Sequence, residues 1–197
     1  MDATSLVPLI GFAFANSITP GPNNLMLMAS GANFGVRRTL AHLAGVAGGF
    51  TLMIVLVGLG VMRLFALWPP AETVLKIACA AFILWLAWRI ARASAPGAAG
   101  ARARPMTFLE AAVFQWLNPK AWAMALGAIT LYAPGREMSA LLLVAAVFGA
   151  VNLPCITTWA LMGRGARRLL DRPARLAVFN AAMALLLVGT LWPVLGM

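Results

Sequence analysis

Six long apolar segments follow one another along the chain, separated by short stretches that contain most of the charged residues. A helix needs about 20 apolar residues to cross the hydrocarbon core of a bilayer, and each segment is close to that length. The sequence therefore predicts an all-α membrane protein with six transmembrane helices. These helices are expected at residues 6–28, 40–62, 71–88, 107–132, 138–162 and 176–195.

Two of the six segments, the first and the fourth, contain helix-breaking residues deep inside them. A proline within a helix removes one N–H group and clashes with the carbonyl four residues earlier, so carbonyl groups at both breaks lose their helical partners. Those carbonyls need side chains, water or a substrate as new partners. The residues at the breaks are Pro20, Gly21, Pro22, Asn23 and Asn24 in the first segment, and Asn118, Pro119 and Lys120 in the fourth.

The two breaks lie at corresponding places in the two halves of the chain. Pro20 and Pro119 are 99 positions apart, and the same shift aligns Asn16 with Gln115. A stretch rich in Ala, Gly, Pro and Arg between the third and fourth segments predicts a cytoplasmic linker. Because each half has three spans, the second half must enter the membrane from the opposite side, which predicts two inverted three-helix repeats. The expected boundaries are 1–92 for the first repeat, 93–105 for the linker and 106–197 for the second repeat.

Charge is scarce and unevenly distributed. Only 10% of the residues are charged and 62% are hydrophobic, whereas a soluble domain has about 25% charged residues. Basic residues gather in the first, third and fifth loops, which the positive-inside rule places in the cytoplasm, so both termini are expected outside. The net charge of +10 then reflects topology and requires no nucleic-acid partner. The eleven basic residues on the cytoplasmic side are Arg37, Arg38, Arg89, Arg92, Arg102, Arg104, Arg164, Arg167, Arg168, Arg172 and Arg175, and the three on the other side are Arg63, Lys76 and Arg136.

Paired breaks in inverted repeats are typical of transporters that bind substrate near the middle of the membrane. Free N–H groups at the start of a half-helix attract a carboxylate, and free carbonyls attract an ammonium group, so the site suits a zwitterion. Asn23 and Asn24 add uncharged donors and acceptors. Lys120 either binds a substrate carboxylate or extends toward a wet cavity. Asn152 either lines the same cavity or bonds to the carbonyl groups that Pro154 frees in the fifth segment.

Two further ionisable residues stand near the cytoplasmic starts of their segments. Glu110 is either a proton carrier or an ordinary acid at the membrane interface. His42 either titrates near neutral pH or is a polar residue at the interface, beside Arg37 and Arg38.

With Pro20-Gly21-Pro22-Asn23 in the first segment and Asn118-Pro119-Lys120 in the fourth, the chain resembles the LysE/RhtB family of amino-acid exporters. The resemblance implies export of amino acids or small relatives across the bacterial inner membrane, driven by the proton gradient, and it places these residues at the transport site. The stretches TPGPNN (19–24) and FILWLAWRIA (82–91) look most like the cysteine and O-acetylserine exporter branch. We therefore expect a small neutral substrate such as cysteine, O-acetylserine, homoserine or threonine.

Two other classes of protein fit the sequence less well. A membrane enzyme needs a nucleophile with a base, or metal ligands, but the one histidine and five acidic residues lie almost entirely in loops or at segment ends. We therefore expect no enzyme activity, no catalytic residue and no cofactor. An exporter of metal ions or other small solutes with the same architecture is the alternative. Because Lys120 would repel a cation and Cys79 and Cys155 lie far apart, no metal site is expected.

Two pairs of glycines have the spacing of close helix contacts. Gly31 and Gly35 form one pair, and Gly45 and Gly49 form the other. Such spacing brings helices together in membranes, either within one chain or between two copies of it. A homodimer is therefore a further expectation.

Overall fold

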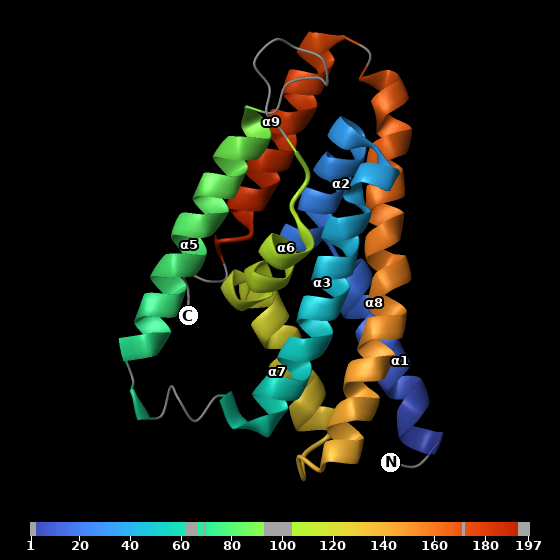
Figure 1. The fold of residues 1–197 in the computed structure, drawn as a ribbon, viewed down its shortest axis with the longest axis vertical. Coiled ribbons are helices and arrows are strands. Elements are labelled where there is room, and N and C mark those ends of the chain that lie inside the picture. The colour runs from blue at the N-terminus through green and yellow to red at the C-terminus, as the bar shows by residue number, and fades with distance from the viewer. Residues whose placement is uncertain (1–2, 62–66, 69, 93–103, 171, 193–197) are drawn as a thin grey trace.

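The structure, a computed structural model, describes residues 3–61, 67–68, 70–92, 104–170 and 172–192 of the 197-residue chain. Every regular element in these residues is helical, which confirms the predicted all-α class (Figure 1). The α-helices are α1 (Ala3–Ile18), α2 (Pro22–Phe34), α3 (Val36–Leu56), α5 (Pro70–Ala91), α6 (Phe108–Phe114), α7 (Pro119–Tyr132), α8 (Met138–Ala166) and α9 (Pro173–Gly189). A π-helical turn, η1 (Val57–Val61), extends α3, and the 3₁₀ turns η2 (Gln115–Leu117) and η3 (Arg167–Leu169) follow α6 and α8.

Each apolar segment of the sequence corresponds to one helix or to a broken pair. The first segment forms α1 and α2, and the fourth forms α6, η2 and α7, with the interruptions at the predicted prolines. Helix boundaries differ from the expected ones by several residues, because α3 begins at Val36 and α8 continues to Ala166. Most of the predicted linker, residues 93–103, lies outside the described residues.

Within the described residues, three helices are long and apolar enough to cross a membrane on their own. They are Val36–Val61, Thr73–Ala91 and Met138–Ala166. Three further apolar helices are shorter, at Leu6–Ile18, Phe108–Leu117 and Pro173–Gly189. Two of the short helices end at the breaks, because a break divides a stretch of membrane-spanning length into two half-length helices.

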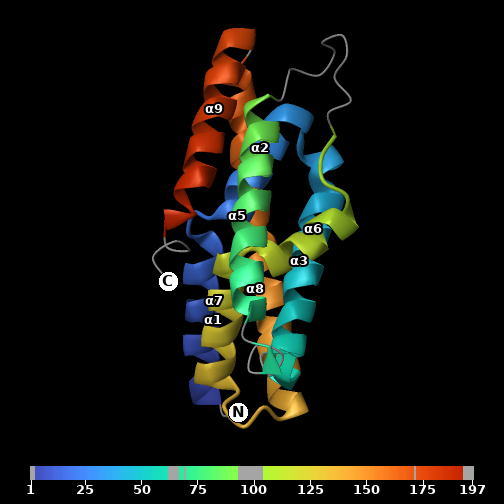
Figure 2. The ribbon, with the colours of Figure 1, turned by 90° about the vertical axis from the view of Figure 1, so that its left-hand side faces the viewer.

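Helix α8 is the common neighbour of α1, α2 and α3, and α6 packs across α3 (Figures 1 and 2). Helices α5 and α9 pair with each other. The junction between α1 and α2 and the junction between α6 and α7 both lie near the middle of the long axis. The fold therefore brings the two breaks to the same level of the molecule.

Two hydrophobic cores hold these helices together. One core joins α2, α3, α5, α6, α8 and α9, and the other joins α1, α3, α7 and α8. The first includes Leu27, Leu43, Ile83, Phe114 and Ile156, and the second includes Leu9, Phe50, Met53, Ala125 and Phe148. The residues of both breaks belong to neither core. Their polar side chains therefore lie outside the two hydrophobic clusters.

Glycines allow two pairs of helices to touch through their backbones. A Cβ atom at Gly45 would collide with the Phe108 carbonyl of α6, and one at Gly49 would lie 2.5 Å from Cα of Ala112. A Cβ at Gly31 would collide with the Ala160 carbonyl of α8. These glycines thus form helix contacts within this chain. The homodimer stays a prediction.

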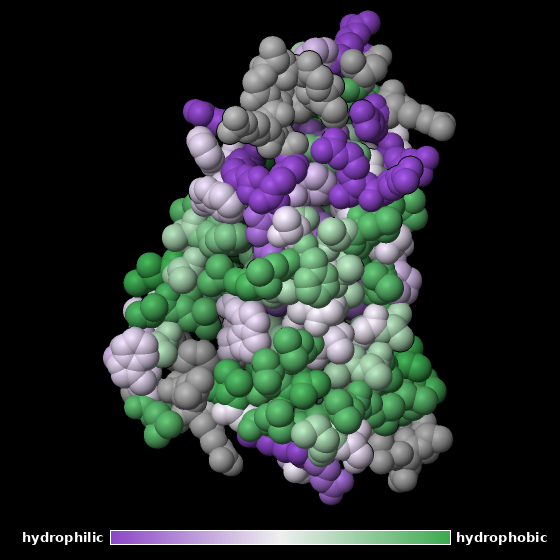
Figure 3. Space-filling model, in the orientation of Figure 1, coloured by the Kyte–Doolittle hydropathy of each residue, from purple (hydrophilic) through white to green (hydrophobic). Residues whose placement is uncertain are grey.

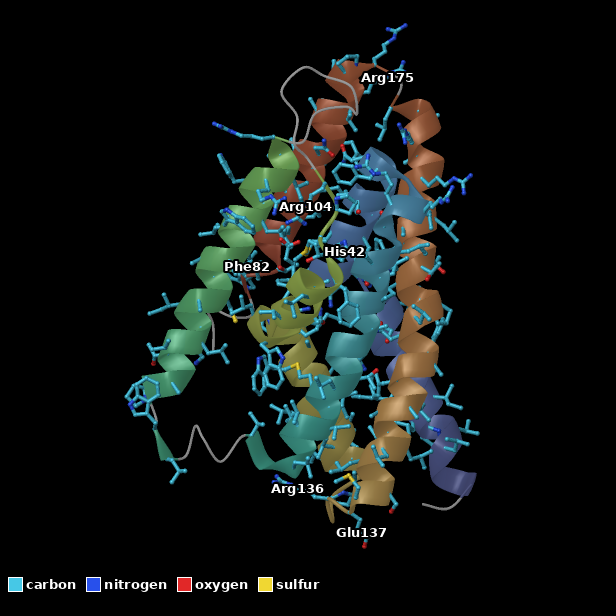
Figure 4. The ribbon with its side chains drawn as sticks, in the orientation of Figure 1. His42, Phe82, Arg104, Arg136, Glu137 and Arg175 are labelled. Atoms are coloured by element: carbon cyan, nitrogen blue, oxygen red, sulfur yellow. The ribbon has the colours of Figure 1, made fainter. Side chains whose placement is uncertain are left out.

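The surface separates into hydrophilic ends and a hydrophobic middle (Figure 3). One end is strongly hydrophilic, and Arg104 and Arg175 lie in this part of the molecule (Figure 4). Arg136 and Glu137 mark the opposite end. This distribution is that of a multi-pass membrane protein with one arginine-rich end, as the loop count predicts.

Candidate functional site

Side chains of α2 and α8 donate hydrogen bonds to the carbonyl groups that the first break leaves without helical partners. Asn24 donates through Nδ2 to the carbonyls of Ser17 and Thr19, at 2.8 Å each. Trp159 on α8 donates through Nε1 to the carbonyl of Ile18 at 3.1 Å. The break is therefore held together by the protein itself in this conformation.

Lys120 links the second break to the first. Its Nζ donates to the carbonyl of Thr19 at 2.6 Å and to that of Pro20 at 3.4 Å. Its backbone N–H donates to Oδ1 of Asn118, the residue that caps the start of α7, at 3.1 Å. A Cβ atom on Gly21 would lie 2.7 Å from Cδ of Lys120, so the glycine leaves the space that the lysine occupies. The ammonium group thus lies against carbonyls of the first break, where the sequence predicts the ammonium group of a substrate.

A reciprocal amide pair joins the two breaks at a second point. Asn23 at the start of α2 donates to Oε1 of Gln115 at 2.8 Å, and Gln115 donates back to Oδ1 of Asn23 at 3.2 Å. Gln115 is fully buried and also donates to the carbonyl of Ala111 at 2.8 Å. The two breaks are therefore coupled through one charged contact and one neutral contact.

A small polar cavity lies between the breaks. Its volume is about 20 Å³, which is close to the space that one water molecule needs and too little for an amino acid. In this conformation the site is therefore closed. The lining residues are Asn16, Ser17, Gly21, Asn23, Asn24, Asn118, Lys120 and Asn152, together with the less polar Phe50, Ala121, Met124 and Ile156.

Six of the nine residues that the sequence suggested line this one cavity. They are Gly21, Asn23, Asn24, Asn118, Lys120 and Asn152. Pro20, Pro22 and Pro119 form the breaks but do not line it. Asn152 is buried and lines the cavity, which is one of the two roles that the sequence left open for it.

Sequence reasoning did not select four other residues at this site. Asn16 and Ser17 line the cavity, and Gln115 and Trp159 bond to the breaks. The alignment of the two halves did place Asn16 opposite Gln115, which was a usable signal. Trp159 gave no such signal, because its contact joins residues 141 positions apart.

The acid at the start of the fourth segment has a structural role. Glu110 forms a two-point ion pair with Arg104, at 2.6 and 2.7 Å, and completes a capping box with Thr107 at the start of α6. The hydrogen bonds to Glu110 raise the pKa of Arg104 above its ordinary value. This pairing matches the interpretation of Glu110 as an interfacial acid.

We expect the amide pair to be measurable as a coupling between the two breaks. Gln115→Ala should cost about 1–3 kcal/mol of unfolding free energy, because it leaves the Asn23 amide without its partner. With Asn23→Ala added, the loss should be smaller than the sum of the two single losses. Denaturant titration of the four proteins in detergent measures the cycle. The same cycle between Gln115→Ala and Thr51→Ala should be additive, since Thr51 bonds to the Ala47 carbonyl instead.

Comparison with known proteins identifies the family of the chain. The model of the LysE type translocator family matches residues 14–190. Cysteine/O-acetylserine efflux proteins of Escherichia coli (strain K12) and Shigella sonnei (strain Ss046) are each 31% identical to the chain over 196 residues, covering 95% of this chain and 96% of each relative. No solved structure matches the chain. A family match across both breaks, together with relatives aligned over nearly their whole length, leads to one conclusion: the chain belongs to the LysE family of translocators.

Proposed function

We propose that the protein exports small neutral amino acids, or close relatives such as O-acetylserine, from the bacterial cytoplasm across the inner membrane. The observation that carries this proposal is the contact of Lys120 with the carbonyls of Thr19 and Pro20 beside a polar cavity. A cation and the carbonyls of the first break lie together there, and these are the two groups that a zwitterion needs. The names of the relatives, efflux proteins for cysteine and O-acetylserine, favour the same class of substrate.

Substrate binding would exchange one set of polar contacts for another. The ammonium group of an amino acid would take the place of Lys120 at the carbonyls of Thr19 and Pro20. Lys120 would then pair with the substrate carboxylate, and the amides of Asn23 and Asn152 would contact the remaining polar atoms. Every buried polar group would keep a partner throughout the exchange, which limits its cost. A cationic side chain would find no carboxylate in this cavity, which favours neutral substrates.

Transport would follow from rocking of two inverted repeats around this site. The first repeat (1–92) would comprise α1, α2, α3 and α5, and the second (106–197) would comprise α6, α7, α8 and α9, giving six spans. The arginine-rich end would face the cytoplasm and both termini the outside. The closed cavity would be the occluded stage of the cycle. The family resemblance also implies that transport is coupled to the proton gradient, and we include this coupling in the proposal.

Export of metal ions or other small solutes remains the alternative function. A divalent cation prefers carboxylate, imidazole or thiolate ligands. Lys120 would repel such an ion from the cavity between the breaks. The two cysteines are buried on different helices, α5 and α8.

Uptake into inverted membrane vesicles tests the proposed function. Labelled cysteine, O-acetylserine, homoserine, threonine and leucine are offered separately under an imposed proton gradient. We expect uptake of one or two of them, lost when an uncoupler collapses the gradient, and none in vesicles that lack the protein. No uptake of any amino acid by correctly inserted protein would overturn the proposal. Metal-ion uptake that disappears in Cys79→Ala/Cys155→Ala would favour the alternative.

A further inference from the structure

A second and larger cavity lies toward the arginine-rich end of the molecule. It is enclosed by α2, α3, α5 and the segment 104–106, and its volume is about 250 Å³. His42 and Arg104, which Figure 4 labels, both line it. Its polar lining consists of Ser30, Asn33, His42, Arg89, Arg92 and Arg104. The proposed transport site uses none of these side chains.

His42 is an unpaired polar group in the wall of this cavity. The side chain is only 2% exposed, so the expected interfacial position is wrong: α5 and the segment 104–106 enclose the face of α3 that carries it. Neither ring nitrogen has a hydrogen-bond partner among the described residues. A neutral imidazole offers one donor and one acceptor, and burying both without partners is unfavourable. Within the described part of the chain, the imidazole therefore has an unused donor and an unused acceptor in the wall of the cavity.

Arg89 in the last turn of α5 and Arg92, which follows α5, give the cavity a positive charge. The guanidinium of Arg89 stacks over the ring of Trp85 at 4.8 Å, and that of Arg92 stacks over Trp88 at 4.9 Å. Neither has a carboxylate partner in the part of the chain that the structure describes. Arg104, by contrast, is neutralised by its ion pair with Glu110. Arg89 and Arg92 thus line the cavity without a carboxylate partner among the described residues, and guanidinium groups bind carboxylates in a two-point geometry.

Helix α2 connects this cavity with the helix breaks. Asn23 at its start lines the small cavity, and Met26, less than one turn further on, lines the large one. Ser30 and Asn33 continue the polar wall, with Ser30 about 10 Å beyond Asn23 at 1.5 Å per residue. One helix therefore carries lining residues of both cavities.

We propose that the large cavity is an access site for the exported amino acid. Arg89 and Arg92 bind its carboxylate, and His42 bonds to the bound molecule, before it moves along α2 to the breaks. This inference rests on the proposed function. The phosphate of an anionic lipid has related chemistry, but the buried polar floor formed by Ser30, Asn33 and His42 favours a small polar solute over a lipid.

Binding measured without transport tests the access site. The protein with Lys120→Met is purified in detergent, and binding of reduced L-cysteine is compared with that of L-cysteinamide, which lacks the carboxylate. We expect cysteine to bind and cysteinamide to bind at least about tenfold more weakly. Arg89→Gln/Arg92→Gln should weaken cysteine binding by about tenfold or more, since each lost carboxylate contact corresponds to about one factor of ten. The His42→Gln variant keeps a hydrogen-bond donor and an acceptor, so it should bind cysteine more tightly than the His42→Leu variant.

A control with the same change in charge separates a built site from a general positive field. Arg37→Gln/Arg164→Gln removes two exposed arginines that do not line the cavity, and cysteine binding should stay within about twofold. Equal loss in both double variants, or no loss in Arg89→Gln/Arg92→Gln, would overturn the access site. A further arm adds phosphatidylglycerol to the detergent. The Arg89→Gln/Arg92→Gln variant could lose lipid binding and keep its cysteine binding. That result would assign the cavity to a lipid headgroup instead.

The outcome for the access site can be separated from that for the proposed function. Vesicle uptake of cysteine with no dependence of its binding on Arg89 or Arg92 would refute the access site alone. If the site is correct, vesicle uptake by Arg89→Gln/Arg92→Gln should need about tenfold more substrate for half-maximal rate, with the maximal rate within about twofold. Absence of both uptake and binding would refute the access site and the proposed function together.

Discussion

Transport should fall by about a hundredfold when Lys120 is replaced by methionine, while the protein still inserts in the membrane. The methionine keeps most of the volume of the side chain but removes the ammonium group. A hydrogen bond to a charged group contributes about 1.5–3 kcal/mol, and 3 kcal/mol corresponds to about two factors of ten in affinity or rate. The loss should affect transport directly, because Lys120 contacts the carbonyls of Thr19 and Pro20. Vesicle uptake at matched membrane levels measures it.

Two companion variants make the Lys120 result specific. Met124→Leu changes another residue of the same cavity at nearly constant volume, and it should keep transport within a few-fold because such exchanges perturb packing little. Lys120→Arg keeps the charge, but its planar group has little room beside Gly21, so partial activity is expected. Asn23→Ala should lower transport as well, through loss of an amide at the cavity. Normal uptake by Lys120→Met and Asn23→Ala would place the transport site elsewhere.

The helix breaks could be predicted because their cause is local. Pro20, Pro22 and Pro119 each lack a backbone N–H group, which kinks or interrupts a helix. The structure accordingly ends α1 at Ile18 and begins α2 at Pro22. A proline alone is not sufficient, because α1 continues through Pro8 and α8 through Pro154. The partners of the freed carbonyls were left open between side chains, water and substrate, because they depend on which helices meet in space.

Two side chains show what sequence alone could not resolve. The sequence left Lys120 either to bind a substrate carboxylate or to extend toward a wet cavity, and in this conformation its Nζ bonds to carbonyls of the first break. For His42 the sequence left open titration near neutral pH or a polar role at the interface, and the structure buries its side chain. Position along a helix gives depth but not direction, and the face that carries His42 turns toward α5 rather than toward lipid or water.

The glycines illustrate the same limit. The spacing of Gly31 and Gly35 suggested one common contact face, yet the two residues have different roles. Gly31 allows the close approach of α8, whereas Gly35 ends α2 with a φ of +78°, a conformation that favours glycine. The partner of the α2 contact, Gly163, lies in a region without a matching GxxxG pattern. Contacts between distant segments thus escape a search for local spacing.

The contact between α2 and α8 leads to the second large effect, at Gly163. A Cβ atom there would collide with the carbonyl oxygen of Met28 and lie 3.0 Å from the backbone nitrogen of Ala32. Both are backbone atoms, so no side chain can rotate away, and Gly163→Ala must push α2 and α8 apart. Overpacking of this kind costs about 3 kcal/mol, which corresponds to a fall in Tm of about 6–12 °C for a chain of this size. Thermal unfolding in detergent measures the shift.

Gly165→Ala is the matched control, two residues further along the same helix. No atom lies within 4 Å of the position of its Cβ, and alanine favours a helix over glycine by up to about 1 kcal/mol. Its Tm should therefore stay the same or rise slightly. Because α2 begins with the residues that line the cavity between the breaks, Gly163→Ala should also lower vesicle uptake, whereas Gly165→Ala should leave it unchanged. Equal Tm values for the two variants would mean that α2 and α8 are farther apart than in this structure. The positions of Asn23 and Asn24 on α2, in the same cavity as Lys120, would then have to be revised as well.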